Sequence, residues 1–344
     1  MATAASPSPS PRLRVAVLHL DFSPDWPDGV DVWVNALRRA CANDVATSAG
    51  AGTVAAAAGA SGGAGAVAAA AAPRPLDADR DVEWAKYEVA RDGVVPAEDA
   101  GFDALVLTGS KFNLSEAATE ALPWVVATAR LLQAVAEGRV RSRLSGERTR
   151  VFGGCFGAQI ISFALGGRVT RNPGDAFVLG TETIVTTAAF AALPCATGLL
   201  VADGGASGGV RVASGATDDE VAALRLGGPA SSAHADVAAA TLSPHLRLFE
   251  THGDCVAELP PGATLLASSP SCRSEIFGVG GTFLAMQSHP EFELALMTER
   301  IWPSVVARGR LVVGDEEARA RASLTPPRHS RAVMAAIWRF LRGC

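Results

Sequence analysis

The sequence has no excess of positive charge: 30 lysines and arginines stand against 35 aspartates and glutamates, for a formal net charge of −5. Proteins that bind nucleic acid usually carry a basic surface, so nucleic acid is not an expected partner. The sequence also lacks a run of bulky apolar residues long enough to span a membrane. The N-terminal apolar run is interrupted by Arg14 and closed by Asp21, so it is a poor signal peptide. We therefore expect no membrane partner either.

The cysteines show no metal-binding pattern. None forms a CxxC pair or has a spacing typical of a zinc site; the six are Cys41, Cys155, Cys195, Cys255, Cys272 and Cys344. In a chain of 344 residues, scattered cysteines of this kind indicate reduced thiols in an intracellular protein. We expect a cytoplasmic protein without a metal ion or other cofactor.

Two tracts lack the large side chains that a hydrophobic core needs. Residues 45–72 contain 15 alanines and 6 glycines, and residues from about 189 to 243 are again rich in Ala, Gly and Ser. Such compositions bury too little apolar surface to offset the entropy lost on ordering, so they predict disordered insertions. An Ala-rich helix is the alternative for the first tract, and its glycines disfavour it. Residues 1–12 are expected to form a disordered leader.

The rest of the chain alternates between apolar runs and amphipathic segments. Helices are predicted over 31–42, 122–139 and 329–343, and strands over 13–20, 102–110, 177–187 and four segments between 246 and 292. Strands alternating with helices favour an α/β fold, a three-layer sandwich with a mostly parallel central sheet.

The stretch VFGGCFGAQIISFALGG, residues 151–167, places one cysteine between glycines at the corner between an apolar strand and a helix. A strand–nucleophile–helix elbow needs such glycines because its backbone is strained and its neighbours approach closely. The start of the following helix favours a thiolate and directs backbone N–H groups, including that of Phe156, at a developing oxyanion. Cys155 is therefore a candidate nucleophile, although a buried cysteine is more often a small hydrophobic residue.

A nucleophilic thiolate needs a base and a group that orients the base. In MQSHPEF, residues 286–292, His289 and Glu291 lie two apart at the end of an apolar strand, so in an extended segment both project to the same side. A carboxylate beside the imidazole would hold it in one tautomer. The alternative is a solvated strand end, and these residues alone do not show that the pair meets Cys155.

Several motifs together resemble a known family. GGCFGAQ resembles the GxCxGxQ elbow of class I glutamine amidotransferases, and SHPEF resembles their HPE motif. LVLTGS is similar to their oxyanion-loop strand, and ETHGDCVAELPPGATLLASS to their His-x-Asp segment. The resemblance covers roughly 13–44, 82–188 and 246–343, and within the family it is closest to a stand-alone branch that includes plant γ-glutamyl peptidases and GMP-synthase-type amidotransferase domains. It implies one flavodoxin-like domain over 13–343, interrupted by the two insertions.

The resemblance implies a role for each matching residue. It implies cleavage of a γ-glutamyl amide bond through a γ-glutamyl thioester, with a catalytic triad of Cys155, His289 and Glu291, oxyanion donors at Gly109 and Phe156, and substrate-binding residues Gln159, His252 and Asp254. The alternatives are purely structural roles: Gln159 could be an ordinary residue of the first helical turn, and His252 and Asp254 could close a turn. The family usually has a branched aliphatic residue at Gly154 and often His or Met at Ala158, so these small residues suggest a roomier pocket.

The leaving group decides between several functions. Because no ATP-pyrophosphatase domain follows SHPEF, we expect a self-sufficient thiol peptidase that acts on small γ-glutamyl peptides or glutathione conjugates. One alternative is an amidotransferase subunit that delivers ammonia to a separate synthetase. Others are a catalytically silent relative that serves as a binding subunit, and a chaperone or protease built on a related cysteine elbow.

Overall fold

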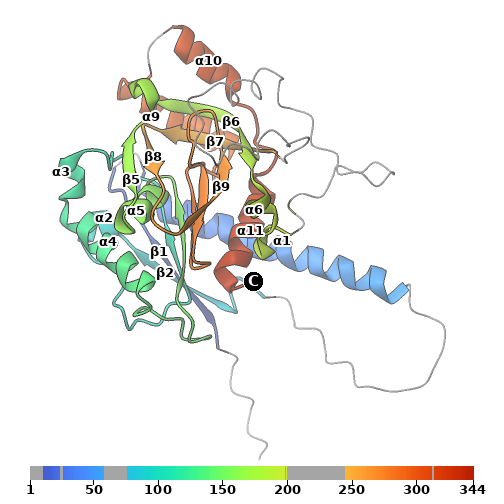
Figure 1. The fold of residues 1–344 in the computed structure, drawn as a ribbon. Helices are drawn as coiled ribbons and strands as arrows, with labels where there is room; N and C mark the ends of the chain where they lie inside the picture. Colours follow the sequence, from blue (N-terminus) through green and yellow to red (C-terminus); the bar gives the residue numbers. More distant parts are fainter. Residues whose placement is uncertain (1–10, 24–25, 58–75, 198, 200–244, 312–313) are drawn as a thin grey trace, which may run out of the picture.

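The computed structural model describes residues 11–23, 26–57, 76–197, 199, 245–311 and 314–344, and these form an α/β fold (Figure 1). At its centre lies a nine-stranded sheet in the order β2-β1-β3-β4-β11-β10-β9-β6-β7. Five neighbouring strands run parallel: β2 (Val82–Tyr87), β1 (Leu13–Leu18), β3 (Ala104–Leu107), β4 (Arg150–Gly154) and β11 (Phe283–Met286). Four more continue the sheet by antiparallel pairing: β10 (Ile276–Val279), β9 (Ala263–Ser268), β6 (Val178–Thr186) and β7 (His245–His252). A separate antiparallel pair consists of β5 (Arg168–Arg171) and β8 (Asp254–Glu258).

Helices cover both faces of the sheet (Figure 1). The longer ones are α1 (Gly29–Ala57), α4 (Pro123–Ala136), α5 (Phe156–Ala164), α10 (Asp315–Ser323) and α11 (Ser330–Arg342). The short ones are α2 (Val89–Asp92), α3 (Ala117–Glu120), η1 (Pro173–Asp175), α6 (Ala188–Ala191), η2 (Pro194–Ala196), α8 (Leu294–Leu296), η4 (Met297–Ile301) and α9 (Trp302–Ala307). Within the described residues, no helix is both long and apolar enough to cross a membrane.

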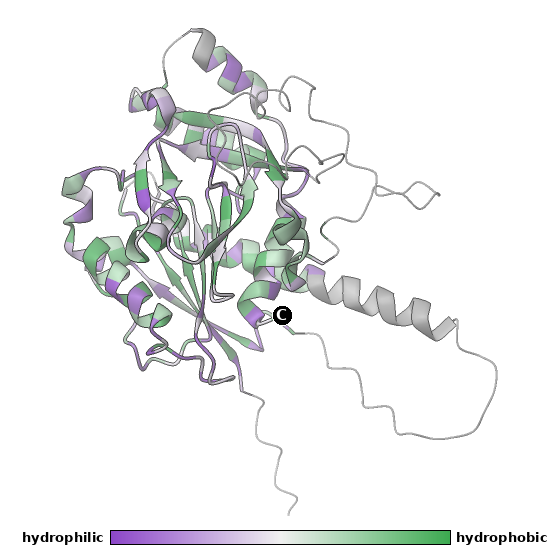
Figure 2. Ribbon diagram, viewed as in Figure 1, coloured by the Kyte–Doolittle hydropathy of each residue, from purple (hydrophilic) through white to green (hydrophobic). Residues whose placement is uncertain are grey.

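Strand β1 shows how the sheet divides two cores. Val15 and Val17 belong to a core shared with α1 and α11, whereas Ala16 and Leu18 belong to a core shared with α4 and α5. Alternate side chains of a strand point to opposite faces, so each face needs its own helical cover. Figure 2 shows the central strands hydrophobic along most of their length. The predicted three-layer α/β sandwich with a mostly parallel sheet is confirmed.

Two predicted boundaries need correction. The helix expected over 31–42 continues to Ala57 as α1, so the first part of the 45–72 tract is helical rather than disordered. Alanine has the highest helix propensity, and extending an existing helix avoids the cost of nucleation. The tract expected from about 189 begins with α6 and η2, whose Phe190, Cys195 and Ala196 are buried in the core. The rest of both tracts, 58–72 and 200–243, and residues 1–10 of the leader lie outside the described residues.

The parallel strands determine where a site can form. The carboxyl ends of β1, β3, β4 and β11 lie along the same edge of the sheet, because neighbouring parallel strands point the same way. In open α/β sheets ligands bind at this edge. The segments that follow these four strands contain Asp21, Gly109, Cys155 and His289.

Candidate active site

Cys155 occupies the corner between β4 and α5. Its backbone has φ 51° and ψ −111°, a conformation that is rare for a residue with a side chain. Its N–H donates to the carbonyl oxygen of Met286 at 2.8 Å, which continues the pairing of β4 with β11. Strain of this kind persists only where the surrounding structure holds it. The predicted sharp strand-to-helix corner is therefore present around Cys155.

Close backbone contacts explain two of the glycines. A Cβ on Gly153 would lie 2.4 Å from the carbonyl oxygen of Gly157. A Cβ on Gly157 would in turn lie 2.5 Å from the carbonyl oxygen of Leu107 in β3. Side chains at either position would push the first turn of α5 away from the sheet. The glycines thus let the helix start directly behind Cys155.

Gly154 and Ala158 do not widen the pocket. A Cβ on Gly154 would lie 2.7 Å from Cζ2 of Trp33 in α1, so the indole fills the space of the missing side chain. Trp33 itself lines the cleft, whereas Ala158 packs into the core beneath α5. Neither small residue therefore opens space in the cleft: at Gly154 the Trp33 indole occupies the space of the missing side chain, and Ala158 faces the core.

His289 follows β11 and is held on three sides. Its N–H donates to the carbonyl oxygen of Phe249 in β7 at 2.8 Å. Its Nδ1 lies 2.8 Å from Oε1 of Glu291, so the ring donates Nδ1–H to that carboxylate. Phe292 stacks on the imidazole, with 4.1 Å between ring centroids and 7° between planes. Among the described residues Nε2 has no hydrogen-bond partner, and this nitrogen is left for chemistry.

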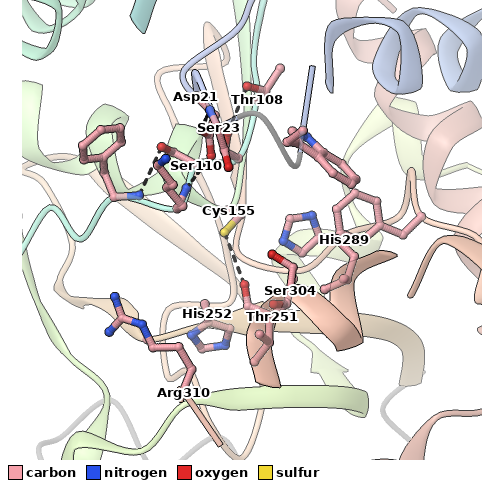
Figure 3. Close-up of a pocket in the computed structure, with 18 of the residues that line it drawn as sticks. Asp21, Ser23, Thr108, Ser110, Cys155, Thr251, His252, His289, Ser304 and Arg310 are labelled. Atoms are coloured by element: carbon pink, nitrogen blue, oxygen red, sulfur yellow. Dashed lines mark hydrogen bonds between the residues drawn. The ribbon is translucent and has the colours of Figure 1, made fainter. Parts of the chain in front are cut away.

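The electrostatics couple His289 to Cys155. Burial lowers the pKa of His289, but the opposing charges of Glu291 and Cys155 outweigh it and raise that pKa to about 10. A protonated imidazole beside a thiol favours the thiolate. Gly109 lies against both groups, since a Cβ there would be 3.2 Å from Cε1 of His289 and 3.5 Å from Cβ of Cys155. Figure 3 shows His289 beside the thiol. The structure thus brings together the three residues of the predicted triad.

The predicted oxyanion donors come from two elements. Gly109 belongs to the loop after β3, and Oδ2 of Asp21 fixes this loop by accepting the N–H of Lys111 at 2.8 Å. Phe156 is the first residue of α5, where a helix offers its N–H no internal acceptor. The Phe156 side chain is buried in the core and does not line the cleft. Both residues neighbour Cys155, and the role of their N–H groups stays a prediction.

Gln287 is a residue of the site that the sequence motifs did not indicate. Its Nε2 donates to Sγ of Cys155 at 3.5 Å, and its Oε1 accepts from Nε2 of Gln159 at 3.2 Å. Nε2 of Gln159 also donates to the carbonyl oxygen of Asp254 at 3.0 Å. The available signal was the position of Gln287 two residues before His289, on the same side of an extended segment. Gln159 lines the cleft, but its amide is bonded to protein groups, and its role in substrate binding stays a prediction.

His252 and Asp254 also line the cleft and are bonded to the fold. Burial lowers the pKa of His252 to about 3, and its neutral ring donates from Nδ1 to the carbonyl oxygen of Asp254 at 3.0 Å. The Asp254 carboxylate accepts from the N–H and Oγ of Ser115 at 2.8 and 2.9 Å. These contacts support the turn-closing alternative, and the substrate-binding role of the pair stays a prediction.

Two buried carboxyl groups lie behind the site. Glu250 and Glu275 are both fully buried. Burial raises the pKa of Glu275 to about 7, although it accepts from the N–H of Ser288 at 2.9 Å. Burial, then the charge of Glu275, also raise the pKa of Glu250. Nothing in the strand pattern of the sequence indicated that these acidic residues would be fully buried.

All the predicted site residues except Phe156 line one open cleft. Trp26, Trp33 and Phe292 form part of its wall, and the C-terminal segment from Arg300 to Arg310 forms another part (Figure 3). In the part of the chain that the structure describes, no group of three or more His, Cys, Asp and Glu residues is arranged to hold a metal ion.

The sequence was compared with those of known proteins and with models of protein families. No protein-family model matches the chain. The chain is 28% identical over 222 residues to gamma-glutamyl peptidase 3 of Arabidopsis thaliana, a match covering 63% of this chain and 66% of that protein. It is 29% identical over 181 residues to the glutamine-hydrolyzing GMP synthase of Bordetella avium (strain 197N), covering 52% of this chain and 27% of the synthase.

A class I glutamine amidotransferase-like family fits this chain. The solved structure of a glutamine amidotransferase from Thermotoga maritima has the same fold: its TM-score is 0.51 at 12% identity, covering 96% of this chain and 99% of that chain. The chain spans just under two thirds of the plant peptidase and about a quarter of the synthase. The family resemblance read from GGCFGAQ and SHPEF is thereby confirmed, as is the flavodoxin-like architecture.

Proposed function

We propose that this protein hydrolyses γ-glutamyl amide bonds with Cys155 as nucleophile, His289 as acid and base, and Glu291 as the group that orients His289. One observation carries the proposal. A cysteine held at positive φ at the start of a helix shares a cleft with a histidine whose other nitrogen is bonded to a buried carboxylate. This is the arrangement of nucleophile, base and orienting group that acyl transfer needs.

The first half of the reaction forms a thioester. The Cys155 thiolate attacks the δ-carbonyl carbon of the γ-glutamyl group, and the carbonyl electrons move onto its oxygen. The N–H groups of Phe156 and Gly109 stabilise this oxyanion, and losing one such donor typically lowers the rate on the order of 100-fold. His289 donates its Nε2 proton to the leaving amine as the C–N bond breaks. The products are a free amine and a γ-glutamyl thioester on Cys155.

The second half releases glutamate. His289, now neutral, accepts a proton from a water molecule, and the resulting hydroxide attacks the thioester carbon. The C–S bond breaks, the thiolate returns, and the imidazole keeps the proton for the next cycle. Glu291 holds the ring through Nδ1 in both halves, so Nε2 always faces the reacting atoms.

For the leaving group we infer an amino acid, peptide or conjugate. The similarity to a plant γ-glutamyl peptidase over 63% of the chain supports this choice. The open cleft, with apolar side chains beyond the triad, also supports a leaving group larger than ammonia. The competing function is ammonia delivery to a separate synthetase, which the similarity to a GMP synthase favours.

The test is hydrolysis by the purified protein of glutathione, γ-glutamylglycine and glutamine. We expect a higher kcat/KM for the peptides than for glutamine, and no activity in Cys155→Ala. Cys344→Ser, which changes an exposed thiol, is the matched control and should stay active. Activity surviving in Cys155→Ala would remove the nucleophile assignment. A preference for glutamine, or activity only after a synthetase is added, would favour the amidotransferase function instead.

A further inference from the structure

Three of the cationic side chains that line the cleft lack an anionic partner among the described residues. Among the four cationic side chains that line it, Arg300 forms hydrogen bonds of 2.8 and 3.0 Å with the carboxylate of Asp28. Lys111, Arg308 and Arg310 take part in no ion pair with any carboxylate whose side chain the structure describes. The cleft therefore offers positive charge to a ligand that enters.

Three carboxylates also line the cleft, and each is held by hydrogen bonds to other protein groups. Asp21 accepts from the N–H groups of Ser23 and Lys111. Asp254 accepts from Ser115, and Glu291 accepts from His289. These carboxylates are thus held in place by the protein, whereas Lys111, Arg308 and Arg310 have no carboxylate partner among the described side chains.

Arg310 is the best placed of the three unpaired cations. Arg308 donates to the carbonyl oxygen of Ser304, and the Lys111 ammonium lies 5.1 Å from the ring centre of Phe22. The Arg310 guanidinium has no hydrogen-bond, ion-pair or ring partner among the described side chains.

The backbone fixes Arg310 in place. Its N–H donates to the carbonyl oxygen of Val305 at 3.2 Å, just after Gly309 turns the chain at φ 62°. The next residue, Leu311, is buried against the core that also contains Trp302. Figure 3 shows Cys155 between the Ser110 loop and Arg310. A ligand that reaches the thiol thus enters the same cleft as the exposed Arg310 side chain, whose backbone is anchored.

We propose that Arg310 binds a carboxylate of the substrate and thereby selects γ-glutamyl compounds by charge. This inference rests on the proposed γ-glutamyl hydrolysis. A guanidinium presents a planar fork of donors that matches a carboxylate with two parallel hydrogen bonds. Two carboxylates could supply this partner: the α-carboxylate of the glutamyl group, and the terminal carboxylate of a peptide leaving group. The chemistry is the same, and the substrates below separate the two.

The experiment compares three substrates in wild type, Arg310→Met and Arg310→Lys. γ-Glutamylglycine carries both carboxylates, whereas γ-glutamylglycine amide and glutamine carry only the α-carboxylate. We expect Arg310→Met to lower kcat/KM on the order of 10-fold wherever the lost bond was made, as for a hydrogen bond to a charged group. Arg310→Lys should restore part of the loss, because it keeps the charge without the fork. Arg130→Met, which removes an exposed arginine of α4 outside the cleft, is the control and should change nothing.

Each pattern has one meaning. A loss confined to γ-glutamylglycine assigns Arg310 to the leaving group, and an equal loss on all three substrates assigns it to the glutamyl α-carboxylate. Unchanged kcat/KM on all three, with an active wild type, would overturn the inference and leave the proposed function intact.

If the wild type hydrolyses none of the three substrates, the proposed function fails, and a binding measurement tests the Arg310 inference separately. Calorimetric titration of γ-glutamylglycine into Cys155→Ala and into Cys155→Ala/Arg310→Met then decides. Weaker binding to the double variant would support the carboxylate site. Equal binding, or none to either protein, would overturn it.

Discussion

At the scale of single residues, the proposed reaction depends on the proton that His289 donates to the leaving amine. Because the folded-state pKa of His289 is raised to about 10, chiefly by Glu291 and Cys155 acting against burial, the imidazole is protonated at neutral pH. We predict that kcat/KM falls as pH rises through about 10, when the acid that protonates the leaving amine is lost. Glu291→Gln should move this fall to lower pH, because it removes the negative charge that holds the proton.

The measurement is a pH profile of kcat/KM on γ-glutamylglycine for both proteins. Glu293→Gln, an exposed carboxylate two residues further along, is the matched control and should leave the profile in place. An alkaline limb that stays where it was in Glu291→Gln would show that Glu291 does not act on His289.

A second residue prediction concerns Gln287. Its amide donates to Sγ of Cys155, and a hydrogen bond to a charged group contributes about 1.5–3 kcal/mol. We predict that Gln287→Leu slows alkylation of Cys155 by iodoacetamide at pH 7 on the order of 10-fold, because the thiolate loses a donor. Gln133→Leu, whose amide bonds the Ala164 carbonyl oxygen instead, serves as control. Equal alkylation rates in all three proteins would contradict a role for the amide.

At the scale of elements, the contact of β4 with α1 can be tested at Gly154. A Cβ there would lie 2.7 Å from Trp33, so we predict that Gly154→Ala lowers the free energy of unfolding by about 1–3 kcal/mol, as overpacking does. Gly278→Ala in β10, whose Cβ would meet atoms only at 3.5 Å, should cost much less. Urea unfolding measures both.

Combining Gly154→Ala with a substitution of Trp33 tests whether Trp33 causes the loss of stability. If Trp33 is the obstacle, Trp33→Leu should make the further change Gly154→Ala less costly than it is alone, a coupling that a double-mutant cycle reads directly. Additive losses would show that the cost of Gly154→Ala arises elsewhere, for instance in the strained backbone of Cys155 next to it.

The elements also show what the sequence could predict. The elbow and the His289–Glu291 pair were predictable because each lies within one short stretch, and local spacing determines which side chains share a side. Trp33 and Gln287 were not, because their contacts with Gly154 and Cys155 join segments far apart in the chain. The extension of α1 to Ala57 was missed since composition alone ignores the packed helix that precedes the alanines.

At the scale of the whole molecule, buried acids link stability to pH. The folded-state pKa of Glu275 is about 7, raised above its ordinary 4.5 chiefly by burial. Protonated Glu275 therefore favours the folded state fully below pH 4.5, and this contribution is lost as pH rises through 7. We predict that the free energy of unfolding falls between pH 5 and 8, and that Glu275→Gln falls less.

Urea titrations at the two pH values test this, with Glu120→Gln, an exposed change in α3, as control. An equal fall in wild type and Glu275→Gln would show that Glu275 does not bind its proton more tightly in the folded state. His289 contributes in the same direction, since its raised pKa means that folding loses support as pH rises from 6.5 towards 10.

The whole fold also explains why the site forms from distant residues. Four parallel strands end at one edge of the sheet, and this edge collects Asp21, Gly109, Cys155 and His289. The alternation of strands and helices predicted the mostly parallel sheet on which this arrangement depends. The position of Arg310 in the cleft follows from the path of the C-terminal segment, and no spacing rule in the sequence fixes that path.

The central claim is that Cys155 is the nucleophile for γ-glutamyl transfer, and covalent labelling tests it most directly. A chloroketone analogue of glutamine is incubated with the wild type, and the modified peptide is identified by mass spectrometry. We expect one adduct, on Cys155, that forms more slowly in Glu291→Gln and is prevented by excess γ-glutamylglycine. A folded protein that is never labelled at Cys155, or is labelled equally at its other thiols, would contradict it.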